Sequence, residues 1–193
     1  MSDHRYLKRL DRRCYRGMAH VHWAQTLDGR ATGWLDDLTH LKFRELLTHM
    51  LGRFGLACPI YCCMPDHFHL LLIGITKGSD QLNAIAFFRK QLNIELNRIG
   101  FRLQKQPYDR VLRNEERQAE QFTDLVEYIA RNPERAGLVG QDEFKSYKYT
   151  GALMPGYPDL YIWSDDYWPR FWSIYSKLRR YGLVRSYDED IEP

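Results

Sequence analysis

The sequence predicts an α+β fold in which helices pack on an antiparallel sheet. Apolar side chains recur with the two-residue period of strands and the three-to-four-residue period of helices, in the order strand, helix, strand, strand, helix, strand. That order is typical of a ferredoxin-like sheet. The 193 residues, 44% hydrophobic and 27% charged, suit one globular domain or one domain with a long tail.

The first strand is expected within residues 17–27, where apolar side chains alternate before an Asp-Gly turn. His20 and His22 lie on its other face and form a His-x-His pair. Because spacing alone is weak evidence for a ligand pair, we interpret these two residues as ordinary strand histidines.

A helix is predicted over residues 37–54, because apolar residues form a broad stripe at helical spacing. Asp37 or Thr39 can cap its start, and Gly55 stands where a left-handed residue ends a helix. Residues 57–64 then predict a strand that turns at a Pro-Asp pair into the next strand.

The strand that begins at His67 carries the strongest local signal for a site. His67 and His69 alternate with apolar residues and therefore project from the same face, where two imidazoles can hold one metal ion. Apolar residues continue on both faces of this strand, which predicts a place in the middle of the sheet.

The second half of the chain predicts further helices and a short strand. We expect helices over residues 79–99 and 115–132, a β-like stretch over 108–112 between them, and a final helix over 165–181. The segment beyond about residue 150 is dense in Tyr and Trp and has the composition of a packed appendage.

The distribution of charge along the chain bears on whether the protein binds nucleic acid. The net charge is +3 at pH 7, and basic residues crowd the start of the chain, at Arg5, Lys8, Arg9, Arg12, Arg13 and Arg16. Such an arm can neutralise phosphates, but from charge alone a solvated terminus is the favoured interpretation.

The four cysteines lack the spacing of a zinc site, so we expect reduced, buried thiols. No apolar run approaches a membrane span, and we expect a cytoplasmic protein.

A polar row follows one face of the helix that ends near Asn132. Asp124, Tyr128 and Asn132 are spaced four residues apart and therefore share that face. A tyrosine can serve as a covalent nucleophile, and an amide oxygen can be a third metal ligand beside two imidazoles. For Tyr128 taken alone, a packed or hydrogen-bonded helix tyrosine is the favoured interpretation. The histidine pair and the polar row together favour a catalytic role.

Three segments, in this order along the chain, resemble one known family. Residues 64–72 (MPDHFHLLL) are similar to the histidine-hydrophobe-histidine motif of HUH single-strand nucleases. Residues 128–139 (YIARNPERAGLV) resemble the tyrosine segment of REP-associated tyrosine transposases, and residues 109–116 (DRVLRNEE) resemble the segment that leads into it. Each segment alone is weak evidence, whereas the three together are specific.

The resemblance implies a fold and a chemistry. It implies the ferredoxin-like or RRM-like fold of HUH single-tyrosine transposases over residues 1–150, followed by an aromatic-rich tail over 151–193 with a possible helix. His67 and His69 would bind Mg or Mn, and Asn132 stands where related insertion-sequence transposases have a glutamine ligand. Tyr128 would attack a single-stranded DNA phosphodiester, leaving a 5′-phosphotyrosine and a free 3′-hydroxyl.

The implied partner is single-stranded or hairpin DNA with a REP-like palindrome, bound by a monomer or a homodimer and without a membrane. The expected backbone contacts are basic residues at the start of the chain, on the second predicted helix and beside Asn132: Arg12, Arg13, Arg16, Arg89, Lys90 and Arg131. Two alternatives remain open. One is a non-catalytic, domesticated nucleic-acid-binding module, and the other is a metal phosphodiesterase that uses water as its nucleophile.

Overall fold

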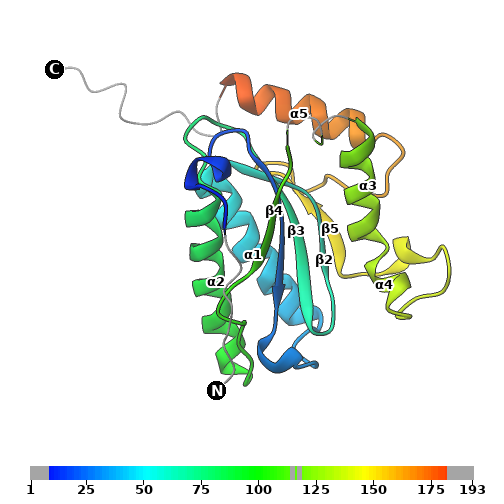
Figure 1. Cartoon of the computed structure of the whole chain (residues 1–193). Coiled ribbons are helices and arrows are strands. Elements are labelled where there is room, and N and C mark those ends of the chain that lie inside the picture. Colours follow the sequence, from blue (N-terminus) through cyan, green and yellow to red (C-terminus); the bar gives the residue numbers. More distant parts are fainter. Residues whose placement is uncertain (1–8, 114–115, 117–118, 182–193) are drawn as a thin grey trace.

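The computed structural model describes residues 9–113, 116 and 119–181. Arg5, Lys8 and the chain after residue 181 lie outside this range. Five antiparallel strands form one sheet in the order β4-β1-β3-β2-β5, with helices on both faces (Figure 1). The α+β prediction is therefore confirmed, and the first four strands have the order of a ferredoxin-like sheet.

The predicted strands and helices occur in the predicted order, and further short elements occur between and after them. The strands are β1 (His20–Thr26), β2 (Leu56–Cys63), β3 (His67–Gly74), β4 (Tyr108–Val111) and β5 (Thr150–Leu153). The α-helices are α1 (Asp37–Phe54), α2 (Gln81–Arg98), α3 (Ala119–Ala130), α4 (Asn132–Arg135) and α5 (Tyr167–Tyr181), and the short 3-10 turns are η1 (Arg12–Tyr15), η2 (Asp28–Arg30) and η4 (Phe144–Ser146).

Helix α1 shows how local sequence sets the boundaries. The carboxylate of Asp36 caps its start by accepting a hydrogen bond from the Thr39 amide at 2.7 Å. The two caps predicted from sequence, Asp37 and Thr39, were therefore both wrong. Gly55 ends the helix with φ 62°, a left-handed conformation that disfavours a side chain.

Helices α1 and α2 cover one face of the sheet and bury most of the large side chains. Trp23, Phe43, Phe68 and Phe88 are each no more than 2% exposed and belong to a single apolar cluster between these helices and the sheet. We call this side of the sheet the closed face. The predicted central position of β3 is confirmed, because β3 pairs with β1 on one side and β2 on the other.

Helices α3 and α5 lie on the opposite face of the sheet (Figure 1). Leu71 and Ile73 of β3 pack there with Ile129 of α3 and Phe171 of α5 in a second apolar cluster. The domain boundary predicted at residue 150 falls on the first residue of β5, which pairs with β2. The described part of the C-terminal segment thus adds one strand and one helix to the same sheet.

The structure also tests the expectations about the thiols and about a membrane span. Cys58, Cys62 and Cys63 are buried free thiols, as predicted, whereas Cys14 is exposed. None of the described helices is both long enough and apolar enough to cross a membrane.

Candidate functional site

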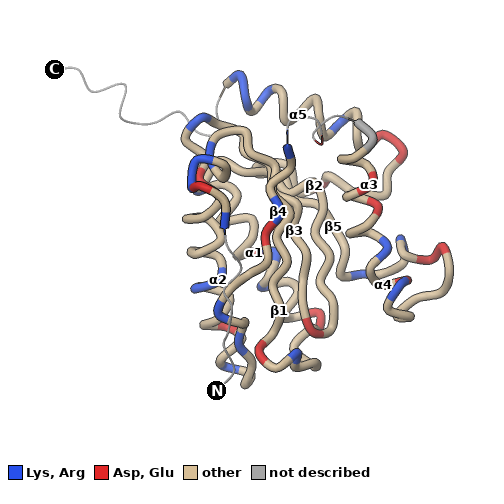
Figure 2. Tube along the Cα trace, in the orientation of Figure 1, with Lys and Arg blue, Asp and Glu red and all other residues tan. Residues whose placement is uncertain are grey.

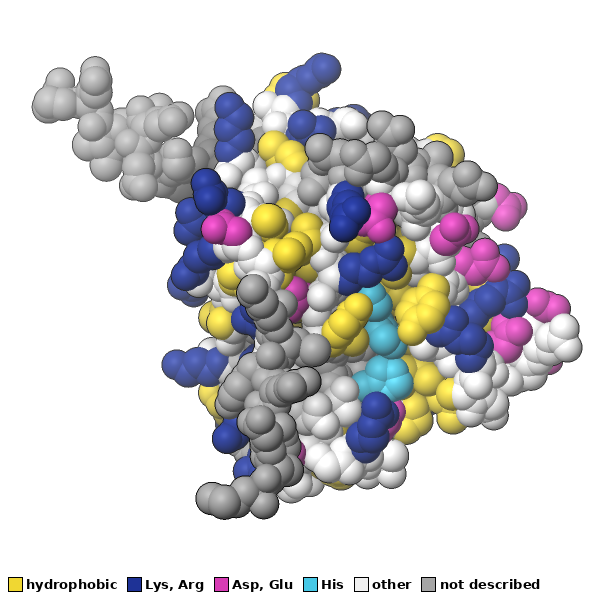
Figure 3. All heavy atoms as spheres, in the orientation of Figure 1, with side chains coloured by type: hydrophobic (Ala, Val, Ile, Leu, Met, Phe, Trp, Pro, Cys, Tyr) yellow, Lys and Arg dark blue, Asp and Glu magenta, His cyan; other side chains and the backbone are white. Residues whose placement is uncertain are grey.

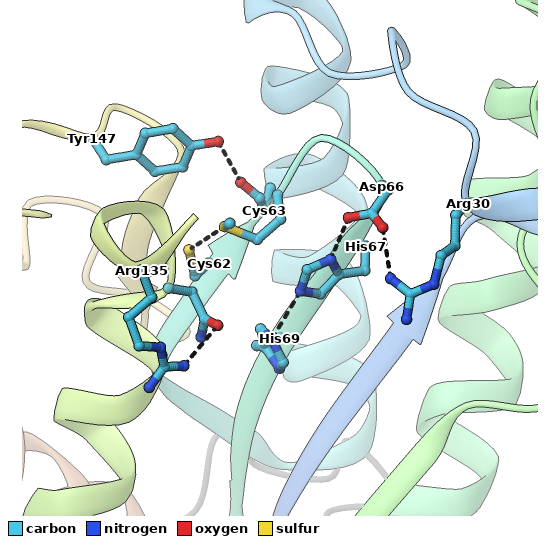
Figure 4. Close-up of polar contacts among 10 residues, drawn as sticks. Arg30, Cys62, Cys63, Asp66, His67, His69, Arg135 and Tyr147 are labelled. Carbon is cyan, nitrogen blue, oxygen red and sulfur yellow. Dashed lines mark hydrogen bonds and ion pairs between the residues drawn. The ribbon is translucent and has the colours of Figure 1, made fainter. Parts of the chain in front are cut away.

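Three histidines from two adjacent strands form a hydrogen-bonded row, which we call the histidine row. His67 Nε2 lies 3.1 Å from His69 Nε2, and His69 Nδ1 lies 3.0 Å from His22 Nε2. The strand register brings them together: Ala24 of β1 is opposite His69, so His22 is its diagonal neighbour on the same face. Figure 4 shows His67 and His69 side by side on β3.

The outer end of the row is held by a carboxylate. His67 Nδ1 donates to Asp66 Oδ1 at 2.5 Å, and Arg30 Nη1 donates to Asp66 Oδ2 at 2.8 Å (Figure 4). Partial burial would raise the pKa of Asp66, but the hydrogen bonds from His67 and Arg30 outweigh it and hold the pKa below its usual value. An ionised Asp66 fixes the proton of His67 on Nδ1 and leaves a lone pair on Nε2, the form in which an imidazole nitrogen coordinates a metal.

The inner histidines are held neutral by burial. His22 is 5% exposed and His69 is 6% exposed. Burial, followed by the charge of Arg110, lowers the pKa of His22 to about 4. Burial, followed by the neighbouring His22, lowers the pKa of His69 to about 3. Neutral imidazole is the form that binds a metal ion, so both residues keep that form at pH 7.

Tyr128 reaches the histidine row from α3. Its ring centroid lies 6.1 Å from that of His69 and 6.2 Å from that of His22, and both contacts are edge-to-face. The side chain is 45% exposed, so the phenol can meet a large substrate from solvent. The structure therefore brings the predicted nucleophile to His69, one of the two predicted histidine ligands, and to His22.

Asn132 lies one turn further on, at the junction of α3 and α4. Its Nδ2 donates to the carbonyl oxygens of Tyr128 and Ile129 at 3.1 and 3.2 Å, and its Oδ1 accepts from Arg135 Nη2 at 3.0 Å. The amide is 9% exposed and closes the end of α3. It sits beside Tyr128 as predicted, but its oxygen is engaged by Arg135, and its role as a metal ligand stays a prediction.

Arg135 connects this junction to Tyr128. Its guanidinium carbon lies 4.0 Å from the centroid of the Tyr128 ring, in cation–π geometry. The same side chain holds Asn132 Oδ1, so one cation orients both predicted site residues. Arg135 was not among the residues selected from sequence, although it falls inside the segment that resembles the tyrosine motif.

His67 and His69 provide two of the ligands that a divalent metal ion needs. Neighbouring ligands on an octahedral ion at about 2.1 Å stand about 3 Å apart, which matches the 3.1 Å between the Nε2 atoms of His67 and His69. No group of three or more His, Cys, Asp or Glu side chains suited to a metal occurs in residues 9–113, 116 and 119–181. Further ligands would have to be an amide, water or the substrate's own phosphate oxygens.

Most basic residues predicted to contact DNA lie away from the row. Arg12 and Arg16 bond to Asn83 and Asp80 at the start of α2, and Arg13 bonds to Asp11. Arg89 donates to two carbonyl oxygens of the segment before β4, and Lys90 is exposed on α2. Their contribution to DNA binding stays a prediction. Basic residues occur on both sides of the sheet (Figure 2).

Arg131 is on the same side as the histidine row but is heavily paired. It contacts Glu127, Glu134 and Asp142 at 2.8 to 3.0 Å and stacks on Phe144. Figure 3 shows histidine side chains at the surface with Lys and Arg around them and hydrophobic side chains on both sides.

The sequence analysis did not predict that His22 belongs to the histidine row. It interpreted His20 and His22 together as ordinary strand residues, and the structure separates them. His20 Nδ1 lies 3.0 Å from the Met18 carbonyl oxygen, whereas His22 contacts His69 directly. The available signal was the shared His-x-His spacing of the two strands. The register that aligns the pairs depends on contacts between residues nearly fifty positions apart.

Comparison with known proteins supports the fold. Neither the protein-family models nor the curated protein sequences contain a match. A solved structure of a REP-associated tyrosine transposase bound to a REP hairpin is similar to this chain, with a TM-score of 0.60 and 17% identity over 78% of this chain and 82% of that one. A structure from Deinococcus radiodurans R1, assigned provisionally as a transposase, has a TM-score of 0.41 and 14% identity over 66% of this chain and 96% of that one.

The class defined by these observations is an α+β sheet domain that presents histidines and a tyrosine at one surface. The first of the two similar structures has this fold over most of its length. This likeness shows the fold, and the resemblance to REP-associated tyrosine transposases rests on residues 64–72 and 128–139.

Proposed function

We propose that the protein is a metal-dependent single-stranded DNA endonuclease and strand transferase that acts on REP-like hairpin DNA. The observation that carries the proposal is the approach of an exposed tyrosine, Tyr128, to within about 6 Å (ring to ring) of His69 and His22. The likeness to a transposase solved with a REP hairpin supports DNA as the partner.

His67 and His69 are the residues that would hold a divalent ion, Mg or Mn, with Asn132 as a candidate amide ligand. When bound, such an ion supplies Lewis-acid polarisation of a phosphoryl oxygen. Asp66 and the strand pairing of β3 fix the two imidazoles before any substrate arrives, which is what a preorganised site requires.

Tyr128 carries the covalent step. Its phenolic oxygen bonds to the phosphorus of the scissile phosphodiester and loses its proton to solvent, the bond from phosphorus to the 3′-oxygen breaks, and the departing 3′-oxygen takes up a proton from solvent. The products are a 5′-phosphotyrosine on the protein and a free 3′-hydroxyl on the DNA. Attack of a 3′-hydroxyl on the phosphotyrosine reverses the step, joins the strands and releases Tyr128.

A second candidate is a module that binds hairpin DNA without cutting it. The observation that favours it is the engagement of Asn132 Oδ1 by Arg135, which leaves two imidazole nitrogens as the metal donors in place. Both candidates share the fold and the DNA partner. They differ in whether a covalent product forms.

The test is an SDS-resistant complex with a labelled single-stranded REP-type hairpin in the presence of Mg or Mn. Wild type is expected to form the complex, and Tyr128→Phe is expected to lose it while hairpin affinity changes less than about twofold. Tyr161→Phe is the matched control, because Tyr161 is also exposed, at 61%, but lies in the segment before α5.

Other outcomes separate the alternatives. An adduct that survives in Tyr128→Phe would rule out this nucleophile. DNA cleavage without any adduct would identify a phosphodiesterase that uses water, and binding without cleavage would identify the non-catalytic module.

A further inference from the structure

When each imidazole of the histidine row carries one proton, the donor and the acceptor of every hydrogen bond along the row can be assigned. Asp66 accepts from His67 Nδ1, so the His67 Nε2 atom presents a lone pair. At 3.1 Å, His69 must then donate from Nε2 to His67. His69 Nδ1 is left as an acceptor, and His22 Nε2 at 3.0 Å must donate to it.

This direction is incompatible with metal binding through both Nε2 atoms. A ligating nitrogen must offer its lone pair, so His69 cannot keep its proton on Nε2. The proton has to sit on Nδ1, where it faces His22 Nε2. His22 can accept that hydrogen bond when its own proton is on Nδ1. A metal ligand generally relies on such a partner at its second nitrogen to fix tautomer and ring orientation.

We propose that His22 is the positioning residue for His69 and that metal loading reverses the hydrogen bond between them. This inference rests on the proposed metal-dependent function. Before loading, His22 donates to His69; after loading, His69 donates to His22. Each imidazole carries one proton in both states, and protons exchange with solvent, so no net proton is released by these two residues.

The protein supplies the rigid frame that this exchange needs. His22 and His69 are on paired central strands, and their rings stack at 5.1 Å with an interplanar angle of 29°. Both rings also contact the Tyr128 ring edge-on. A change of tautomer therefore leaves the rings and the nucleophile in place while it converts His69 from donor to ligand.

Metal affinity provides the first test. The Kd for Mn²⁺ is measured by electron paramagnetic resonance on the full chain, without DNA. His22→Phe is expected to weaken binding by about 10- to 100-fold, as loss of an outer partner of a ligating histidine does. His22→Gln, whose amide can donate or accept, is expected to recover most of the affinity. His20→Phe is the matched control, because His20 is on the same strand and face and contacts the Met18 carbonyl.

The second test observes the tautomers in the wild-type protein. Long-range ¹H–¹⁵N correlation spectra of the histidine rings are recorded with and without Mg²⁺. We expect His22 and His69 to carry Nε2 protons without metal and Nδ1 protons with it. An Nδ1 proton on His69 before metal addition, or an unchanged His22 on loading, would overturn the reversal.

The outcomes distinguish the inference from the proposed function. Wild type that binds neither ion would overturn both. Wild type that binds Mn²⁺ with an affinity equal to that of His22→Phe would overturn the role of His22 and leave the metal-dependent function standing.

Discussion

The two faces of the sheet use the same strands for opposite purposes. On the closed face, Trp23 and Phe68 lie beneath α1 and α2 and are no more than 2% exposed. On the other face, α3 and α5 cover Leu71 and Ile73, and the neighbouring His69, 6% exposed, lies beside Tyr128, which is 45% exposed. Stability and site chemistry are thus carried by alternate residues of one strand, β3.

The largest expected effect is on the closed face. Phe43 is fully buried and its ring packs on those of Phe68 and Phe88 at 5.1 and 5.3 Å. Phe43→Ala should lower the free energy of unfolding by about 3–5 kcal/mol, measured by urea denaturation. Tyr128→Ala, on the helix α3 that packs on the opposite face, should cost about 1 kcal/mol or less, because its side chain is half-exposed.

Leu41→Ala is the control for Phe43→Ala, since Leu41 is on the same helix and 64% exposed. It should change stability by less than about 0.5 kcal/mol. Equal losses of unfolding free energy for Phe43→Ala and Tyr128→Ala would contradict the view that the closed face contributes more to stability than the face that carries the site.

The second prediction concerns pH and the buried histidine of the closed face. Burial, followed by the charge of Arg44, lowers the pKa of His40 to about 4. The unfolded chain takes up this proton near pH 6.5, and the folded chain does so only near pH 4, so stability falls as pH drops through that interval. In His40→Gln the loss of unfolding free energy between pH 7 and 4.5 should be smaller, by at most about 3 kcal/mol.

Chemical denaturation at the two pH values checks this. His49→Gln, an exposed position on the same helix, should keep the wild-type pH dependence. A His40→Gln variant with an unchanged pH dependence would show that this imidazole does not remain neutral in the folded state.

A third, smaller effect is expected at the junction of α3 and α4. Arg135→Gln removes the cation above the Tyr128 ring and weakens the hold on Asn132 Oδ1. The rate constant for adduct formation should fall about tenfold through loss of positioning, with stability changed by about 1 kcal/mol or less. Arg179→Gln is the control, because Arg179 lies over the ring of Tyr175 on α5. A wild-type rate for Arg135→Gln would assign this contact a purely structural role.

The smallest effect compares Lys90, a predicted DNA contact, with a basic residue of β4 that sequence analysis did not select. Arg110 of β4 is opposite His22 in register, whereas Lys90 is exposed on α2. For a single-stranded hairpin, Arg110→Gln should reduce the slope of log affinity against log salt by about 0.7, and Lys90→Gln by less. Fluorescence anisotropy over a salt series measures both slopes. A larger change for Lys90→Gln would place the DNA backbone along α2.

Local patterns predicted the parts of the fold that local contacts determine. The helix over residues 37–54 was predicted with its observed bounds, because a helical apolar stripe ends at Gly55. The central place of β3 followed from apolar residues on both of its faces. Strand β5 was missed, because its four residues form a strand only by pairing with β2, about ninety positions earlier.

The site residues also divide into those that local sequence identifies and those that it does not. His67 and His69 follow from spacing within one strand, and Tyr128 and Asn132 from a resemblance in one segment. His22 was missed because its role arises where β1 lies beside β3. That strand register is set by the whole core, and no short window of sequence contains it. Arg135 lies only three residues after Asn132, and its role was missed because it depends on how its side chain lies over the Tyr128 ring.

The most direct test of the proposed chemistry is to locate the covalent bond. Wild-type protein is incubated with the single-stranded hairpin and Mn²⁺, digested with nuclease and protease, and analysed by tandem mass spectrometry. The proposed function predicts a nucleotide attached through its 5′-phosphate to Tyr128. Attachment to another residue, or cleaved DNA with unmodified Tyr128, would contradict it.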